Sequence, residues 1–286
     1  MNVADSDKIP GMIEPAEQKM LFDLARQLQL SQGDCLVEFG SFFGRSTYCI
    51  AEGLKANQGL HSSHTLHAYD SFKCDEKGGF AHSVAGYAKR GSVADKVTHD
   101  HDKVGFRGVF EHYLGDHIAQ KLVTVVEAEL RDSLAPDAPI AFMHIDSPKY
   151  YAEFKTILFR FFPKLKKGAV VIFQDYFYHW SATLVAATQL LVEAGLIKLH
   201  YSVASSMVVE VIDTISLEAV LDIDLAVQNK DMVPLIDNAI KACQSIAIDR
   251  KQQFLSRLQL AKVQYLWEEN NLPQATFEFK SFLSST

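Results

Sequence analysis

Acidic and amide side chains recur in this sequence at the ends of short apolar runs. Glu38 lies in the first such run and Asp70 ends the second. Asp146 follows a later run, and Gln174 with Asp175 follows the one after it. In an open parallel sheet, ligands bind in the crevice at the carboxyl ends of the strands. The spacing therefore predicts a binding site built from these strand ends.

The first of these runs leads into a glycine-containing loop. Glu38, Gly40, Gly44 and Ser46 are spaced as in a strand, a tight turn and a helix start. Gly40 allows a sharp turn, and Gly44 allows the backbone to approach a ligand closely. The helix start after Gly44 offers free N–H groups and a positive dipole end, which suits a pyrophosphate or the carboxylate of methionine. The pattern lacks the third glycine of the dinucleotide fingerprint, and a purely structural turn is the alternative.

Asp70 is a further candidate for binding the same ligand. An acidic residue at the end of the second strand can accept hydrogen bonds from both hydroxyls of a ribose, as it does in doubly wound folds. A solvated turn residue is the alternative. Together with the glycine loop upstream, Asp70 favours an adenosine-containing ligand.

The later strand ends could supply a metal site and a base. The oxygens of Asp146, Gln174 and Asp175 are of the kind that Mg²⁺ or Ca²⁺ takes as ligands, although they could equally cap nearby helices and loops. Lys149 follows Asp146 closely, and burial or a neighbouring ion would lower the pKa of a lysine. His179 titrates near neutral pH. Either could act as a general base; a solvated lysine and a packed histidine are the alternatives.

Two other histidine-containing stretches are interpreted as structural. His99–Asp102 alternates histidine and aspartate, but no strand or helix is predicted to fix these side chains, so a solvated loop is expected. His144 lies inside an apolar run and is expected to be a hydrogen-bonded core residue.

The elements that must position these residues alternate along the chain. Helices are predicted over residues 11–30, 45–55, 151–165 and 181–194, and strands over 35–39, 65–69, 122–126, 140–145, 169–173, 197–203 and 207–212. Alternating strands and helices predict a parallel sheet with right-handed crossovers. The last two strands have no helix between them, which implies one antiparallel strand. The long polar stretch 71–116 is typical of a lid or a set of small helices.

After residue 213 the pattern changes to helical periodicity. Residues 217–246, with an interruption at Pro234, and 249–269 are predicted to be helical, with no strand among them. We interpret residues 214–286 as a helical appendage that packs on the core or contributes lid, substrate or subunit contacts.

Bulk composition limits the function classes. The 286 residues carry a formal net charge of −7 and no long basic run, which argues against nucleic acid or a membrane surface as partner. The amino-terminal residues lack a signal-peptide pattern, and no apolar stretch reaches the ~18 residues of a membrane span. The four scattered cysteines form no CxxC pair, as expected in a reducing compartment. We therefore expect a cytoplasmic protein.

Four motifs occur in the order found in a known group of enzymes. They are Val37–Thr47, Ala68–Phe72, His144–Asp146 with Tyr150, and Gly168–Tyr176. Together they resemble the class I methyltransferases around the macrocin O-methyltransferase family, whose members methylate sugar hydroxyls of natural products. The resemblance implies an α/β fold with a doubly wound, Rossmann-like, seven-stranded and mostly parallel sheet.

The resemblance also implies a division of the chain and a set of site residues. Residues 1–213 would form the S-adenosylmethionine-binding domain, and 214–286 a C-terminal helical extension. The positions that would hold the cofactor are Glu38, Gly40, Ser41, Phe42, Gly44, Ser46, Asp70, Ser71, Ala128, Glu129 and Asp146. Asp146, Gln174 and Asp175 would hold Mg²⁺. Lys149 stands where catechol O-methyltransferases, which are related in fold, have their base, and His179 is the other candidate.

The predicted function is S-adenosylmethionine-dependent methylation of a hydroxyl group on a small molecule or glycan, with Mg²⁺ as a candidate second cofactor. The C-terminal helices offer a surface for a homo-oligomer. The sequence departs from the family at Pro148 and Gln174, where the family has aspartates. Those departures keep open a methyltransferase-like binding or assembly protein without catalysis. A nucleotide-sugar or nicotinamide-dependent enzyme on the same scaffold is the other alternative.

Overall fold

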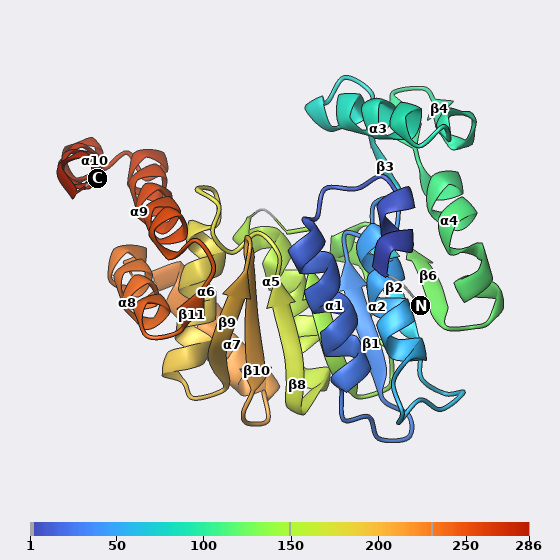
Figure 1. The fold of residues 1–286 in the computed structure, drawn as a ribbon. Coiled ribbons are helices and arrows are strands. Elements are labelled where there is room, and N and C mark those ends of the chain that lie inside the picture. Colours follow the sequence, from blue (N-terminus) through green and yellow to red (C-terminus); the bar gives the residue numbers. More distant parts are fainter. Residues whose placement is uncertain (1–2, 149, 230, 286) are drawn as a thin grey trace. The chain divides into compact units, whose positions relative to one another are not determined.

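The computed structural model describes residues 3–148, 150–229 and 231–285. In this part of the chain, eight strands form one mixed sheet in the order β11-β9-β10-β8-β7-β1-β2-β6 (Figure 1). The chain divides into two compact units, residues 1–142 and 143–286, and strand β7 (Ile140–Ile145) spans the boundary between them. The sequence predicts a functional boundary at residue 213. These compact units do not test that boundary, which stays a prediction.

The first unit is built around three parallel strands with their helices. These strands are β1 (Cys35–Phe39), β2 (Leu66–Asp70) and β6 (Val123–Glu127), and β2 pairs with both of the others. Every residue of β1 is buried, because all of its residues except Glu38 are apolar. The other elements are the 3₁₀ helix η1 (Val3–Lys8), α1 (Pro15–Gln27), α2 (Arg45–Lys55) and the 3₁₀ helix η3 (Leu130–Asp132).

The polar stretch after β2 forms a small folded insertion. It contains β3 (Lys73–Asp75), α3 (Gly79–Arg90), the 3₁₀ helix η2 (Ala94–Lys96), β4 (Thr98–Asp100), β5 (Lys103–Gly105) and α4 (Arg107–Ala119). The three short strands pair in an antiparallel sheet of their own. The predicted alternative of small helices was thus partly right, and the short strands were not anticipated. The His99–Asp102 run lies at the exposed hairpin of this sheet.

The second unit contains further strands and the remaining helices. Its strands after β7 are β8 (Leu165–Phe173), β9 (Ile197–Val203), β10 (Ser206–Val211) and β11 (Ala247–Ile248). Strand β10 runs antiparallel to both β8 and β9, as the missing helix between the last two predicted strands implied. The 3₁₀ helix η4 (Phe162–Lys164) follows α5 (Tyr151–Arg160), and α6 (Ala182–Glu193) follows β8.

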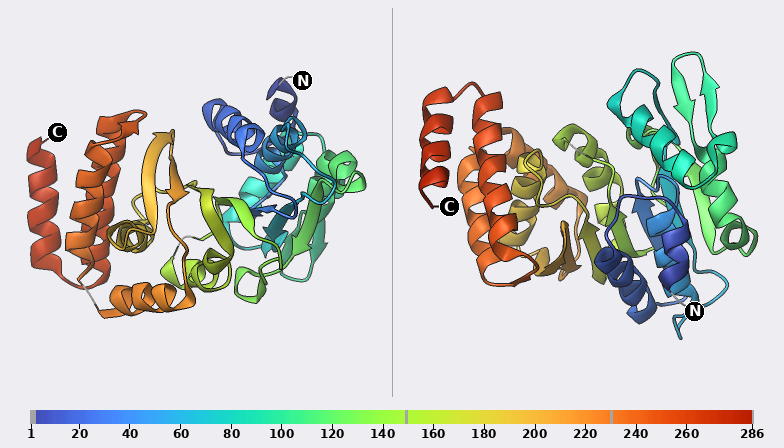
Figure 2. Two further views of the ribbon diagram at one scale, coloured as in Figure 1. Left: turned by 90° about the horizontal axis from the view of Figure 1, so that it is seen from below. Right: turned by 45° about the horizontal axis from the view of Figure 1, so that its top comes forward.

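Residues beyond 213 are mainly helical. They form α7 (Leu217–Asn229), α8 (Met232–Gln244), α9 (Lys251–Glu268) and α10 (Leu272–Ser285). Helices α9 and α10 lie side by side (Figure 2). The prediction that this region contains no strand was wrong, because β11 pairs in parallel with β9. None of the described helices is long and apolar enough to cross a membrane.

Candidate functional site

The loop after β1 adopts a conformation that requires its glycines. Gly40, Phe42 and Gly44 have φ angles of 83°, 49° and 93°, in the left-handed region that residues with a Cβ atom seldom occupy. The Gly40 N–H donates to the Tyr69 carbonyl at 2.9 Å, and the Gly44 N–H donates to the Ser41 carbonyl at 2.8 Å. The loop is therefore a fixed turn, and helix α2 begins directly after it.

The absence of a side chain at Gly44 is also needed for packing. A Cβ atom at this position would overlap the side chain of Leu114 in α4 and crowd the ring of Phe110. Sequence reasoning gave Gly44 a close approach to a ligand. In the structure, the group that approaches it closely is a helix of the insertion, so this glycine has a structural role whatever binds at the loop.

Glu38 holds the loop in place through buried hydrogen bonds. Its side chain is fully buried, and its Oε2 atom accepts hydrogen bonds from Ser41 Oγ at 3.2 Å and from Thr47 Oγ1. Ser46, in the first turn of α2, is buried as well. Thr47 is a residue that sequence reasoning did not assign to the site, although its position next to Ser46 in the first turn of the helix was a usable signal.

Asp70 joins the glycine loop to the end of β2. Its Oδ2 atom accepts the N–H of Phe42 at 2.9 Å, and its Oδ1 atom accepts the N–H of Phe72 at 2.7 Å. A carboxylate oxygen has two acceptor positions, so each oxygen can accept one further hydrogen bond. The sequence assigns these two acceptors to the hydroxyls of a ribose, and this assignment stays a prediction.

The electrostatic surroundings of Asp70 are unusual for an aspartate. The pKa of Asp70 is raised to about 6, mainly because the carboxyl group is buried. The hydrogen bonds from the Phe42 and Phe72 N–H groups oppose this shift, and the negative charges of Glu38 and Glu129 add to it. The carboxylate is therefore held in a place where its charge is disfavoured. Hydrogen bonds from a bound polyol would relieve that cost.

The end of β6 lies next to Asp70. Asp70 is paired with Glu127 in the parallel register of β2 and β6, and the Ala128 N–H donates to the Asp70 carbonyl at 3.0 Å. Glu129 is exposed and lies 3.7 Å from the ammonium of Lys73. The structure thus brings the predicted cofactor residues of the first unit to neighbouring strand ends; they are Glu38, Gly40, Ser41, Phe42, Gly44, Ser46, Asp70, Ser71, Ala128 and Glu129.

Aromatic rings from the insertion surround the loop. The Phe42 ring stacks on Phe43 at 4.0 Å and contacts Phe80 and Phe106 at 5.4 and 5.5 Å between ring centroids. The Tyr87 ring meets Phe42 edge-on at 5.7 Å. Phe80 is 41% exposed, so an apolar surface remains open beside the loop.

The raised pKa of Asp70 predicts a pH dependence of S-adenosylmethionine binding. The ionised carboxylate accepts hydrogen bonds from ribose hydroxyls better than the protonated acid does, so affinity should rise as the pH increases through about 6. We expect binding to be about tenfold weaker at pH 5 than at pH 7, measured by calorimetric titration. The variant Asp70→Asn cannot ionise and should bind with an affinity that is flat over this range. The same slope in Asp70→Asn would assign the titration to another group.

A second cluster lies at the ends of β7 and β8. His144 is fully buried, and its Nε2 atom lies 3.1 Å from Oε1 of Gln174. The Ser206 hydroxyl donates to the same oxygen at 2.8 Å. The prediction that His144 is a hydrogen-bonded core residue is confirmed.

These contacts bear on the predicted metal site. Because the amide oxygen of Gln174 already accepts from Ser206 and His144, it could bind an ion only by giving up these partners. Asp146 and Asp175 are half-buried. Within the described residues, no group of three histidine, cysteine, aspartate or glutamate side chains could hold a metal ion. As arranged here, the three residues do not fit an oxygen-rich Mg²⁺ site.

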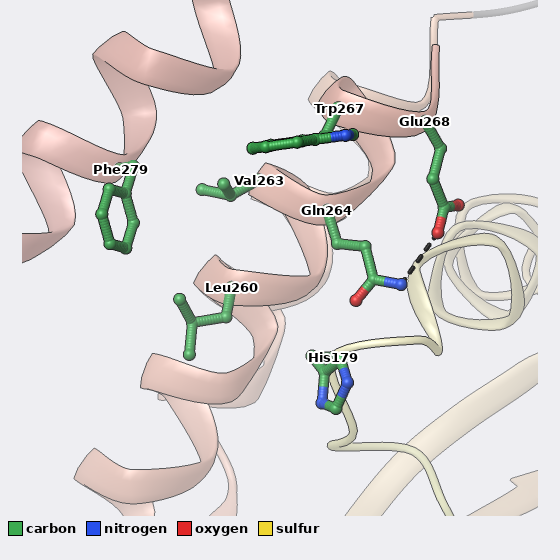
Figure 3. Close-up of a pocket in the computed structure, with 7 residues that line it drawn as sticks. All are labelled: His179, Leu260, Val263, Gln264, Trp267, Glu268 and Phe279. Carbon is green, nitrogen blue, oxygen red and sulfur yellow. Dashed lines mark hydrogen bonds between the residues drawn. The ribbon is translucent and has the colours of Figure 1, made fainter. Parts of the chain in front are cut away.

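Of the two candidate bases, His179 can be placed and Lys149 lies outside the described residues. His179 is exposed and lines an open groove of about 700 Å³ formed with α9 and α10 (Figure 3). The apolar part of the groove consists of Leu260, Val263, Trp267 and Phe279, and the polar part of His179, Gln264 and Glu268. Gln264 donates to Glu268 at 2.8 Å, so the polar edge is partly ordered.

The chain is similar to known proteins. A family model described as a methyltransferase domain matches residues 37–176, which include the glycine loop and Asp70. The solved structure of the O-methyltransferase NovP is 18% identical, with a TM-score of 0.51 over 71% of this chain and 83% of NovP. The O-methyltransferase from Bacillus cereus in complex with SAH is 16% identical, with a TM-score of 0.42 over 74% of this chain and 87% of that chain. No curated protein matches this chain.

The fold is the Rossmann-like fold of class I methyltransferases. The match of residues 37–176 to a methyltransferase domain makes this part of the chain similar to the enzymes that the sequence motifs resemble.

Proposed function

We propose that this protein transfers a methyl group from S-adenosylmethionine to a hydroxyl oxygen of a small molecule or a sugar. The observation that carries the proposal is the arrangement of Asp70, with one acceptor position left on each oxygen next to a glycine turn. The structural similarity to NovP, itself an O-methyltransferase, supports oxygen as the acceptor atom.

The residues of the chain divide the work of such a reaction. Asp70 and the loop from Gly40 to Gly44 would hold the ribose and the methionine part of the cofactor. S-adenosylmethionine bound there would supply an electrophilic methyl group on a sulfonium, with S-adenosylhomocysteine as the leaving group. His179 would take the proton from the acceptor hydroxyl, which makes the oxygen a better nucleophile. Lys149 is the second candidate for this role.

The groove beside His179 supports a small-molecule acceptor. Its volume of about 700 Å³ is in the usual range of ligand pockets. Trp267 and Phe279 are 67% and 43% exposed, and a flat apolar ligand would cover them. The polar edge formed by Gln264 and Glu268 could orient the hydroxyl groups of such a ligand. We therefore expect an acceptor with an apolar body and several hydroxyls, such as an aromatic glycoside.

The remaining parts of the proposal concern partners and compartment. The four cysteines are free thiols, which supports a reducing compartment and hence the cytoplasm. Leu272, Phe277 and Leu283 of α10 are exposed, which supports self-association through the C-terminal helices. The acidic net charge supports a reaction that involves neither nucleic acid nor a membrane surface.

Metal dependence is tested by removal of divalent ions. The Gln174 oxygen already accepts two hydrogen bonds, so we expect methylation in excess chelator to stay within about twofold of the untreated rate. Removal of a true metal cofactor would have a much larger effect, because such an ion lowers the activation barrier by several kcal/mol. Turnover with the acceptor is the measurement, and added Mg²⁺ is the control. Loss of activity that Mg²⁺ restores would assign Asp146 and Asp175 to an ion after all.

A binding protein without catalysis is the second candidate. Pro148 stands where the family has an aspartate, and Gln174 is held in the interior by Ser206 and His144, so both departures remove acidic groups from the second cluster. Such a protein would bind S-adenosylmethionine and methylate none of the hydroxylated acceptors.

Calorimetric titration with S-adenosylmethionine tests the proposed function directly, with a nicotinamide dinucleotide as the comparison ligand. We expect binding of the first and none of the second. The reverse result would favour the nicotinamide-dependent alternative, and failure of both would remove the proposal.

A further inference from the structure

A second, polar cavity lies in the first unit beside the glycine loop. It has a volume of about 280 Å³ and is lined by η1 and the turn after it, by the start of α2, and by the end of α3. The charged side chains that line it are Lys8, Arg45, Arg90 and Asp7. A concentration of cations is unexpected in a chain with a net charge of −7.

Arg45 is held in position but is not neutralised. Its Nε atom donates to the Ile9 carbonyl, which fixes the guanidinium at the cavity wall. Within the described residues, its other nitrogens have no hydrogen-bond or ion-pair partner. Asp7 is close enough to act on the charge of Arg45, but burial and the charge of Arg90 lower the pKa of Arg45. The site therefore contains cationic charge that an anion would stabilise.

Arg90 adds a second guanidinium with free donors. Its guanidinium lies over the Tyr87 ring, 4.0 Å from the ring centroid, and among the described residues no carboxylate pairs with it. Stacking leaves the edge of a guanidinium free to donate in its plane, and two such groups recognise carboxylates and phosphates well. Lys8 is paired with Asp5 at 2.7 Å, so the two arginines are the available donors.

The backbone at this cavity is closely packed. A Cβ atom at Gly91 would come within 2.5 Å of Pro10 Cγ, and one at Gly11 within 2.9 Å of Arg45 Cβ. These glycines let η1 and its following turn approach α2 and α3, which brings the two guanidiniums to one cavity. Because Arg45 follows Gly44 directly and Tyr87 contacts Phe42, the cavity is adjacent to the loop assigned to the cofactor.

We propose that this cavity is an oxyanion site, in which Arg45 and Arg90 bind a carboxylate or phosphate carried by a small molecule. Two sources share this chemistry. One is the methionine carboxylate of S-adenosylmethionine, and that version rests on the proposed function. The other is inorganic phosphate or a phosphorylated metabolite, and that version is independent of the proposed function.

The test compares two variants that lose the same charge. Arg90→Gln removes a guanidinium from the cavity, whereas Lys89→Gln removes an exposed cation that precedes it on α3 and does not line the cavity. Both are titrated calorimetrically, at constant ionic strength, with inorganic phosphate, S-adenosylmethionine and decarboxylated S-adenosylmethionine. Arg45→Gln is a second variant, and circular dichroism checks the fold of each.

We expect Arg90→Gln to weaken binding of one oxyanion by about tenfold or more, the usual effect of a lost hydrogen bond to a charged group, and Lys89→Gln to leave it unchanged. Weaker binding of S-adenosylmethionine but not of its decarboxylated form identifies the cofactor carboxylate as the ligand. Weaker binding of phosphate alone identifies a separate phosphate site. Affinities that are equal in Arg90→Gln and Lys89→Gln for every probe would overturn the oxyanion site. A wild-type protein that binds phosphate but not S-adenosylmethionine would count against the proposed function only.

Discussion

Replacing Asp70 by alanine should lower the affinity for S-adenosylmethionine by roughly 100-fold or more, because each of the two lost hydrogen bonds to a charged group contributes about 1.5–3 kcal/mol. The variant loses both acceptors for the ribose. It also leaves the N–H groups of Phe42 and Phe72 without the carboxylate that now accepts them, so the glycine loop itself should become less well ordered. Calorimetric titration measures the affinity.

The control for this experiment is Asp116→Ala, which removes an exposed carboxylate from α4. It changes the net charge by the same amount and should bind the cofactor like the wild type. Near-equal affinities for Asp70→Ala and Asp116→Ala, with both proteins folded, would show that Asp70 is a structural residue of the turn.

The second large effect is expected at His179. Loss of a positioned general base lowers the rate by about 10²–10⁴, so His179→Ala should reduce single-turnover methylation by that factor. Its affinity for S-adenosylmethionine should not change, since the proposed role of His179 is at the acceptor hydroxyl.

His112→Ala is a suitable control, because His112 is also exposed and also contacts a neighbouring aromatic ring. Lys149→Met tests the other candidate in the same assay. A rate that falls only in Lys149→Met would transfer the role to the lysine, and unchanged rates in both variants would leave catalysis to positioning of the reactants.

The main sheet was predictable because its strands are short apolar runs with turn residues at each end. Strand β1 was predicted at Cys35–Phe39 and helix α2 at Arg45–Lys55, the bounds that the structure has. Strand β8 was predicted too short, since Lys166–Gly168 resembles a turn, whereas the structure carries the strand through Gly168 with a φ of 81°. Local sequence gives no signal for such an irregular strand residue.

The proximity of Asp70 to the loop from Gly40 to Gly44 was predictable, because both follow neighbouring parallel strands. Their role in binding the cofactor stays a prediction. The partners of a side chain were not predictable, because they come from distant segments. Gln174 was assigned to a metal, but its oxygen accepts from Ser206, which is 32 residues away in the chain. The guanidinium pair of Arg45 and Arg90 was missed for the same reason.

Strand β11 has a consequence for the exposed edge of strand β9. It adds only Ala247 and Ile248 to the sheet, opposite Tyr201 and Ser202 of β9. An open edge strand is a template for strand addition by another copy, and this short segment covers part of that edge. Helices α7 and α8 precede β11 in the chain and return it to the edge of β9. Residues beyond 213 therefore also protect the sheet, since a chain that stopped near residue 213 would expose the edge of β9 and be prone to aggregate.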